Sequence, residues 1–150
     1  MYSFIKQLPN AHRLRDADGC TPLHAATGAG KMDMSQLLVQ AGADVRSGDN
    51  DGWEPLHFAC GNGHYGTAQW LLQAGANVTA RSNDGWQPMH AAADAGETQL
   101  GRFLATFSRA ELRAKDAEGQ EPVHLAAGGG HLDFVRWLVR GQQGDCAVVT

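Results

Sequence analysis

The sequence predicts an all-α fold, a solenoid of stacked helix-turn-helix units joined by β-hairpin-like turns. First, a proline followed two residues later by a histidine recurs at spacings of 33, 33 and 34 residues, at Pro22 and His24, Pro55 and His57, Pro88 and His90, and Pro122 and His124. Second, glycines keep this period at Gly19, Gly52, Gly85 and Gly119, and at Gly30, Gly63, Gly96 and Gly130. Such a period is typical of repeat proteins, in which each unit buries its apolar face against its neighbours.

Each unit begins with a tight turn and a short first helix. The blocks DADG, DNDG, SNDG and DAEG supply the Asp, Asn and glycine residues that such turns use. The proline belongs in the first turn of a helix, where its missing N–H costs nothing. First helices are therefore predicted to begin near Thr21, Glu54, Gln87 and Glu121 and to end at Gly30, Gly63, Gly96 and Gly130.

A second helix with a bulkier apolar stripe is predicted to follow and to cover the first. The stripes are Met34, Leu37 and Leu38; Ala68, Trp70, Leu71 and Leu72; Leu100, Phe103 and Leu104; and Phe134, Val135, Leu138 and Val139. Trp70 and Trp137 lie on these helices and are predicted to belong to the core. Glycines at Gly42 and Gly75 are expected to end the first two of them.

The whole pattern resembles the ankyrin repeat family, whose unit reads D-x-x-G-x-T-P-L-H-x-A-A-x-x-G-H, a second helix, and G-A-x-V. The resemblance implies one ankyrin-repeat domain over residues 1–150, with a truncated first unit at 1–15 and repeats at 16–48, 49–81, 82–115 and 116–150. Phe4, Ile5 and Leu8 are expected to form the second helix of the truncated unit. The threonine before proline is present only at Thr21, and the third and fourth repeats lack the G-A-x-V segment. In the irregular segment 105–115, Ser108 and Glu111 have the spacing of a capping box.

Composition argues against several classes of function. The net charge is −4 and the pI about 5.9, so neither nucleic acid nor an anionic membrane surface is an expected partner. The first 15 residues do not resemble a signal peptide, and no segment approaches the roughly 20 apolar residues of a membrane helix. Three cysteines without a CxxC pair, Cys20, Cys60 and Cys146, favour an intracellular, reducing compartment, either cytoplasm or nucleus.

The sequence offers no motif that supports catalysis, a cofactor or a metal. The periodic histidines could suggest a metal-ligand ladder, but the family resemblance implies that they bond to the backbone of the turns. Residues 61–66 fit GxGxxG, yet they lie between two predicted helices rather than after a strand. We therefore predict a non-catalytic protein that binds no cofactor and no metal.

The candidate binding surface consists of the turn tips and the outward positions of the first helices. The family resemblance implies that the residue after the turn glycine is variable and faces outward, here Cys20, Trp53, Trp86 and Gln120. Exposed tryptophans are typical interface anchors. The alternative, compatible with the first, is that the two indoles simply cover each other or the neighbouring hairpin and stiffen the stack.

Charged and small residues extend this surface. The candidates are the tip aspartates Asp18, Asp51 and Asp84, the groove residues Asn62 and Asp94, and the junction residues Arg81 and Lys115. They predict a basic partner segment, helical or extended, although aspartates are also the ordinary residues of such turns. Arg81 and Lys115 could contact the same partner or balance the aspartates.

The predicted function is a non-catalytic protein-protein interaction module, mostly monomeric. One alternative is that the chain is a targeting or regulatory segment of a larger enzyme, channel or effector. A second is a structural homo-oligomer that stacks end to end, because an unsealed terminal repeat exposes apolar surface.

Overall fold

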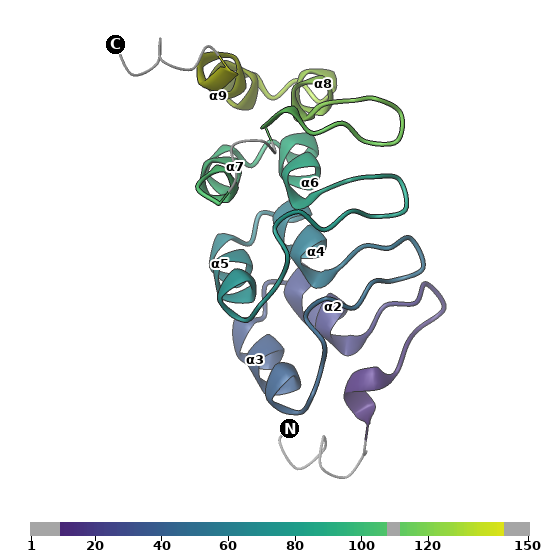
Figure 1. The fold of residues 1–150 in the computed structure, drawn as a ribbon. Helices are drawn as coiled ribbons and strands as arrows, with labels where there is room; N and C mark the ends of the chain where they lie inside the picture. Colours follow the sequence, from purple (N-terminus) through teal and green to yellow (C-terminus); the bar gives the residue numbers. More distant parts are fainter. Residues whose placement is uncertain (1–9, 108–111, 143–150) are drawn as a thin grey trace.

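A computed structural model describes residues 10–107 and 112–142. Its first helices are α2 (Pro22–Gly28), α4 (Pro55–Gly61), α6 (Pro88–Ala95) and α8 (Pro122–Gly128). Its second helices are α3 (Met32–Gln40), α5 (Tyr65–Gln73), α7 (Thr98–Ala105) and α9 (Leu132–Gln142), and a short 3-10 helix, η1 (Ala11–Arg13), precedes them all. The two sets of helices stack in two columns, and the hairpins project from the column of first helices (Figure 1). Each first helix packs on its own second helix and on the next first helix. The predicted all-α solenoid of stacked helix-turn-helix units is confirmed.

The first helices begin where the sequence predicts. Thr21, Glu54, Gln87 and Glu121 are their N-caps, and a proline occupies the first turn of each. The helices end one or two residues before the predicted glycines. Gly30, Gly63, Gly96 and Gly130 instead adopt positive φ values between 72° and 76°, which reverse the chain toward the second helix.

Each hairpin is closed by an aspartate or serine side chain. Asp49 Oδ1 accepts hydrogen bonds from the N–H groups of Asp51 and Trp53, both at 2.9 Å, and its own N–H donates to the Trp53 carbonyl at 2.9 Å. Asp16, Ser82 and Asp116 occupy the same position in the other hairpins. Successive tips are also joined, because Asn50 N–H donates to the Asp18 carbonyl at 3.0 Å and the next two tips repeat the bond. The tips therefore form a connected ladder, and within the described residues none of it is a regular strand.

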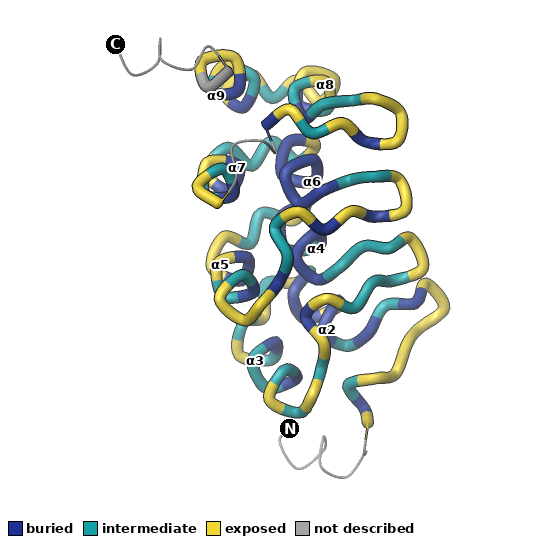
Figure 2. Tube along the Cα trace, in the orientation of Figure 1, coloured by how far each residue is buried: buried dark blue, intermediate teal, exposed yellow. Residues whose placement is uncertain are grey.

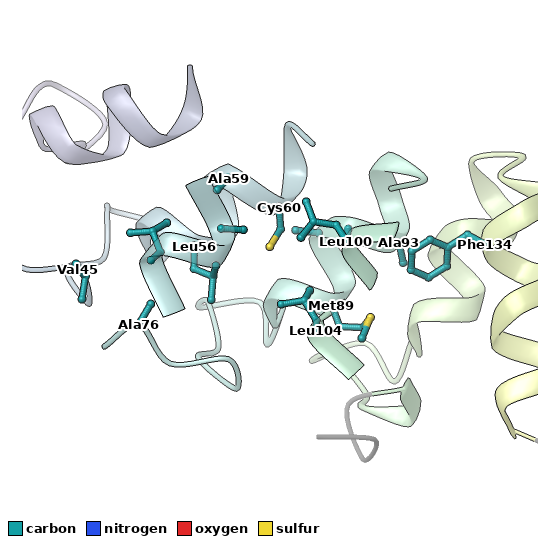
Figure 3. Close-up of a cluster of buried hydrophobic side chains, with 14 of the residues drawn as sticks. Val45, Leu56, Ala59, Cys60, Ala76, Met89, Ala93, Leu100, Leu104 and Phe134 are labelled. Atoms are coloured by element: carbon teal, nitrogen blue, oxygen red, sulfur yellow. The ribbon is translucent and has the colours of Figure 1, made fainter. Parts of the chain in front are cut away.

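The core lies between the two columns of helices. Burial is nearly continuous along α4 and α6 (Figure 2), and side chains from both columns meet in one apolar cluster (Figure 3). Leu56, Leu71, Leu104, Phe134 and Leu138 are fully buried in it. Trp70 and Trp137, predicted to be core residues, are only partly buried and pack against the edge of this cluster. The alanine-rich first helices allow this close approach, with Ala91, Ala92 and Ala93 all buried in α6.

Two sequence predictions lie outside the described residues. These are the helix expected at Phe4, Ile5 and Leu8, and the capping box of Ser108 and Glu111.

The N-cap residue of the second repeat is a weak point of the fold. Thr21 Oγ1 accepts from the His24 N–H at 3.4 Å, but Glu54 at the same position leaves Oε1 buried without a hydrogen-bond partner. Burial raises the pKa of the Glu54 carboxyl. We expect Glu54→Thr to raise the free energy of unfolding by about 1 kcal/mol at neutral pH, because it removes the orphaned oxygen and adds a cap. Urea unfolding at neutral pH measures the gain.

The fourth repeat provides a matched control for this substitution. Glu121 occupies the same N-cap position, but its Oε1 lies 3.3 Å from Arg113 Nε. We therefore expect Glu121→Thr to give no gain. Equal gains in both variants would show that threonine acts only through general helix capping and that the orphaned oxygen of Glu54 has no cost.

Candidate functional site

The repeated histidines hold neighbouring repeats together. In the second repeat, the Glu54 N–H donates to His57 Nδ1 at 3.0 Å, and His57 Nε2 donates to the Trp86 carbonyl of the next repeat at 2.8 Å. His24 makes the equivalent pair of bonds, to the Thr21 N–H and the Trp53 carbonyl. His90 Nδ1 accepts the Gln87 N–H in the same way, but its Nε2 lies 2.9 Å from the Ala114 carbonyl and 3.3 Å from the equivalent Gln120 carbonyl. Both ring nitrogens are thus used by the backbone, as the resemblance implied. Within residues 10–107 and 112–142, no group of three His, Cys, Asp or Glu side chains is arranged to hold a metal ion.

A groove lies between the hairpins and the first helices of the second and third repeats. Its volume is about 370 Å³. It is lined by the aromatic side chains of Trp53, Phe58 and Trp86 and by the carboxylates of Asp49, Asp51 and Asp94. The remaining lining residues are small or carry an amide: Gly61, Asn62 and Ala91. No lysine or arginine is among these lining residues, so the groove combines apolar surface with uncompensated negative charge.

The aromatic side of the groove is one continuous set of rings. Trp53 lies 5.8 Å from Trp86 between ring centroids, 5.8 Å from Phe58 and 5.4 Å from His57. Phe58 in turn meets His24 edge-on at 5.1 Å. Trp86 is fixed further by a 3.2 Å hydrogen bond from its Nε1 to Asp116 Oδ2. The two indoles therefore do cover each other, as the alternative interpretation proposed, and they also form a wall of the groove.

The carboxylates of the groove differ in their roles. Asp49 is used by the hairpin, and the Cys20 thiol also points to its Oδ2 at 3.8 Å. The side chains of Asp51 and Asp94 are exposed and make no hydrogen bond or ion pair with the rest of the described chain. Asp51 lies on the hairpin tip, whereas Asp94 lies in the last turn of α6. Two free carboxylates thus face the groove from opposite elements.

The structure brings five of the predicted binding residues together at the groove, namely Trp53, Trp86, Asp51, Asn62 and Asp94. Asn62 also donates to the Gly28 carbonyl at 3.0 Å, which links it to the preceding repeat. Sequence reasoning missed Phe58 as a lining residue. The signal was present, because Phe58 stands where the other repeats have Ala25, Ala91 and Leu125.

The other predicted binding residues do not line the groove: Cys20, Gln120, Asp18, Asp84, Arg81 and Lys115. The sequence suggested that Arg81 contacts a partner or balances the aspartates, but the structure gives it a structural role. Its Nη1 donates to the Gly85 carbonyl at 2.9 Å and to the Lys115 carbonyl at 2.8 Å, so it ties two hairpins together. Arg15 makes the equivalent bonds to Gly19 and Gly48 at the first hairpin.

Comparisons with known proteins agree with this architecture. A family model described as ankyrin repeats, in three copies, matches residues 1–82 and again residues 79–148. The curated proteins contain no match to the chain. No helix in the described part of the chain has the length and apolarity to cross a membrane.

Proposed function

Because the chain belongs to the ankyrin repeat family, whose members generally mediate contacts between proteins and are typically non-catalytic, we propose that it binds a partner protein through its hairpin tips and first helices. The observation that carries the proposal is the groove of Trp53, Phe58 and Trp86 with free carboxylates at Asp51 and Asp94. Tryptophan is enriched among the residues that contribute most to interface energy, and carboxylates beside it favour a partner of opposite charge. The partner is then a segment with basic character, which complements the groove.

Charge reversal is a sharper test of this function than removal of the tryptophans. Trp53 packs against the fully buried His57, so Trp53→Ala would also weaken the fold. Asp51 and Asp94 are exposed, and reversing them leaves the core intact. The matched control reverses Asp33 and Asp133, two exposed aspartates on the second helices α3 and α9.

The experiment compares the wild-type chain, Asp51→Lys with Asp94→Lys, and Asp33→Lys with Asp133→Lys. Proteins captured from a cell extract by the wild-type chain are identified and purified, and their Kd values are measured by calorimetry after circular dichroism confirms equal folding. We expect the groove variant to lose at least about tenfold in affinity and the control to lose less than about twofold, since a buried charge contact is worth more than about 1.4 kcal/mol. Equal affinity of all three chains would contradict the proposal.

The compartment is part of the same proposal. Cys20 and Cys60 are both free thiols, and Cys60 is fully buried in the core. Burial also raises the pKa of the Cys60 thiol, so this side chain acts as a small apolar residue. These thiols support a reducing, intracellular compartment, which imaging of a tagged chain would test directly.

A further inference from the structure

The groove suggests which side chain of the partner it receives. Its apolar wall is made of aromatic rings rather than aliphatic side chains, and a cation is attracted to the face of an indole. Its free charges are the carboxylates of Asp51 and Asp94, which come from the hairpin and from the end of α6. A ligand that uses the whole groove must therefore be cationic, stack on aromatic rings and reach acceptors on two sides.

Arginine meets these three requirements better than lysine. Its guanidinium is planar and weakly hydrated, so it stacks on an indole at a lower desolvation cost than an ammonium. Its five N–H donors point in fixed directions and can pair with two separate carboxylates at once. A groove of about 370 Å³ also has room for one long side chain and its neighbouring backbone.

We propose that the groove is a site for one arginine side chain of the partner segment, with the guanidinium on the indoles of Trp53 and Trp86 and its N–H groups donating to Asp51 and Asp94. This inference rests on the proposed function and names the anchor of that contact. Asp49 contributes its negative charge only, because its Oδ1 accepts two backbone N–H groups of the hairpin.

The four tryptophans of the chain provide a built-in test. Trp53 and Trp86 line the groove, whereas Trp70 and Trp137 lie on the second helices α5 and α9 and serve as internal controls. The probe is the capped peptide Gly-Gly-Arg-Gly-Gly, compared with the same peptide carrying lysine or citrulline, the uncharged analogue of arginine. The indole N–H signals of the folded chain are followed by two-dimensional NMR during each titration.

We expect the arginine peptide to shift the Trp53 and Trp86 signals in a saturable way, the lysine peptide to bind about tenfold more weakly, and the citrulline peptide to cause no shift. Asp51→Asn with Asp94→Asn should abolish the shifts, whereas Asp33→Asn should retain them. The dispersion of the four indole signals reports whether each variant is folded. Arginine and lysine binding equally, shifts spread over all four tryptophans, or no shift at all would each overturn the inference.

The two proposals can fail separately. If a partner binds through the groove but the arginine peptide shifts neither Trp53 nor Trp86, the protein-binding function stands and the arginine anchor is wrong. If the arginine peptide shifts both signals but reversal of Asp51 and Asp94 leaves partner affinity unchanged, the groove recognises arginine and the partner binds elsewhere.

Discussion

The chain is expected to lose stability steeply as the pH falls from about 7 to about 5, because three buried histidines must stay neutral in the folded state. His24, His57 and His90 are all fully buried. The Nδ1 atom of each ring accepts a backbone N–H at 3.0 Å, so a proton added there would face another N–H. Burial lowers the pKa of all three rings, although hydrogen bonds from Nε2 to carbonyl oxygens partly oppose the shift.

The sign of the pH dependence follows from the lowered pKa of these three rings in the folded chain. The unfolded chain binds protons at these rings near their ordinary pKa of about 6.5, whereas the folded chain binds them only at lower pH. The stabilisation is therefore complete above about pH 6.5 and is lost as the pH falls toward the lowered pKa values of the folded state. Together the three rings give the free energy of unfolding a maximal slope of about 4 kcal/mol per pH unit, because each proton contributes about 1.4 kcal/mol per pH unit. Glu54, whose pKa burial raises, acts with the opposite sign, because it favours the folded state at low pH and loses that contribution as the pH rises through its raised value.

Urea unfolding at a series of pH values between about 7.5 and 5 measures the slope, and His57→Gln should reduce it by at most the share of one proton, about 1.4 kcal/mol per pH unit. NMR titration of the imidazole rings in the wild-type chain gives an independent reading that does not depend on the stability of this variant. A slope smaller than one proton, or rings that titrate at their ordinary pKa in the folded chain, would contradict the prediction.

The fold was predictable because one unit of sequence maps onto one unit of structure. Proline at the start of each first helix and glycine after its end are local signals, and both predict the helix bounds within two residues. The outcome at the N-caps was less predictable. Only the structure shows that Glu54 buries Oε1 without a hydrogen-bond partner, while Glu121, at the same position, pairs with Arg113. That difference depends on residues from the preceding loop, which a repeat pattern does not describe.

The site was predictable in its aromatic part and less so in its charges. A tryptophan directly after the turn glycine is expected at the hairpin, next to the groove, and both tryptophans line it. The aspartates of the tips looked equivalent in sequence. In the structure the first aspartate of the second hairpin, Asp49, is bound to the hairpin, while Asp51 is free. Arg81, a candidate for partner contact, is held by two backbone carbonyls.

A second large effect on stability is expected at Gly101, where α7 contacts α9. This glycine is buried in the interior of α7, and a Cβ added there would lie 2.8 Å from two ring carbons of Phe134 and 2.9 Å from Trp137 Cζ3. Phe134 is itself fully buried and cannot move aside without opening the core. We expect Gly101→Ala to lower the free energy of unfolding by about 2 kcal/mol, since overpacking outweighs the roughly 1 kcal/mol that alanine gains over glycine in a helix.

Gly66, in the first turn of α5, is the matched control for Gly101. A Cβ there would meet only Met32 Cε at 3.1 Å, the end of a flexible side chain, so Gly66→Ala should be neutral or stabilise the chain by up to about 1 kcal/mol. Urea unfolding of both variants measures the contrast. A double-mutant cycle with Phe134→Leu separates packing from propensity, because a smaller side chain at 134 leaves space for the alanine and part of its cost should disappear. If Gly101→Ala costs the same with leucine at 134 as with phenylalanine, the clash with the ring is not the cause, and the close packing of α7 against α9 does not limit this position.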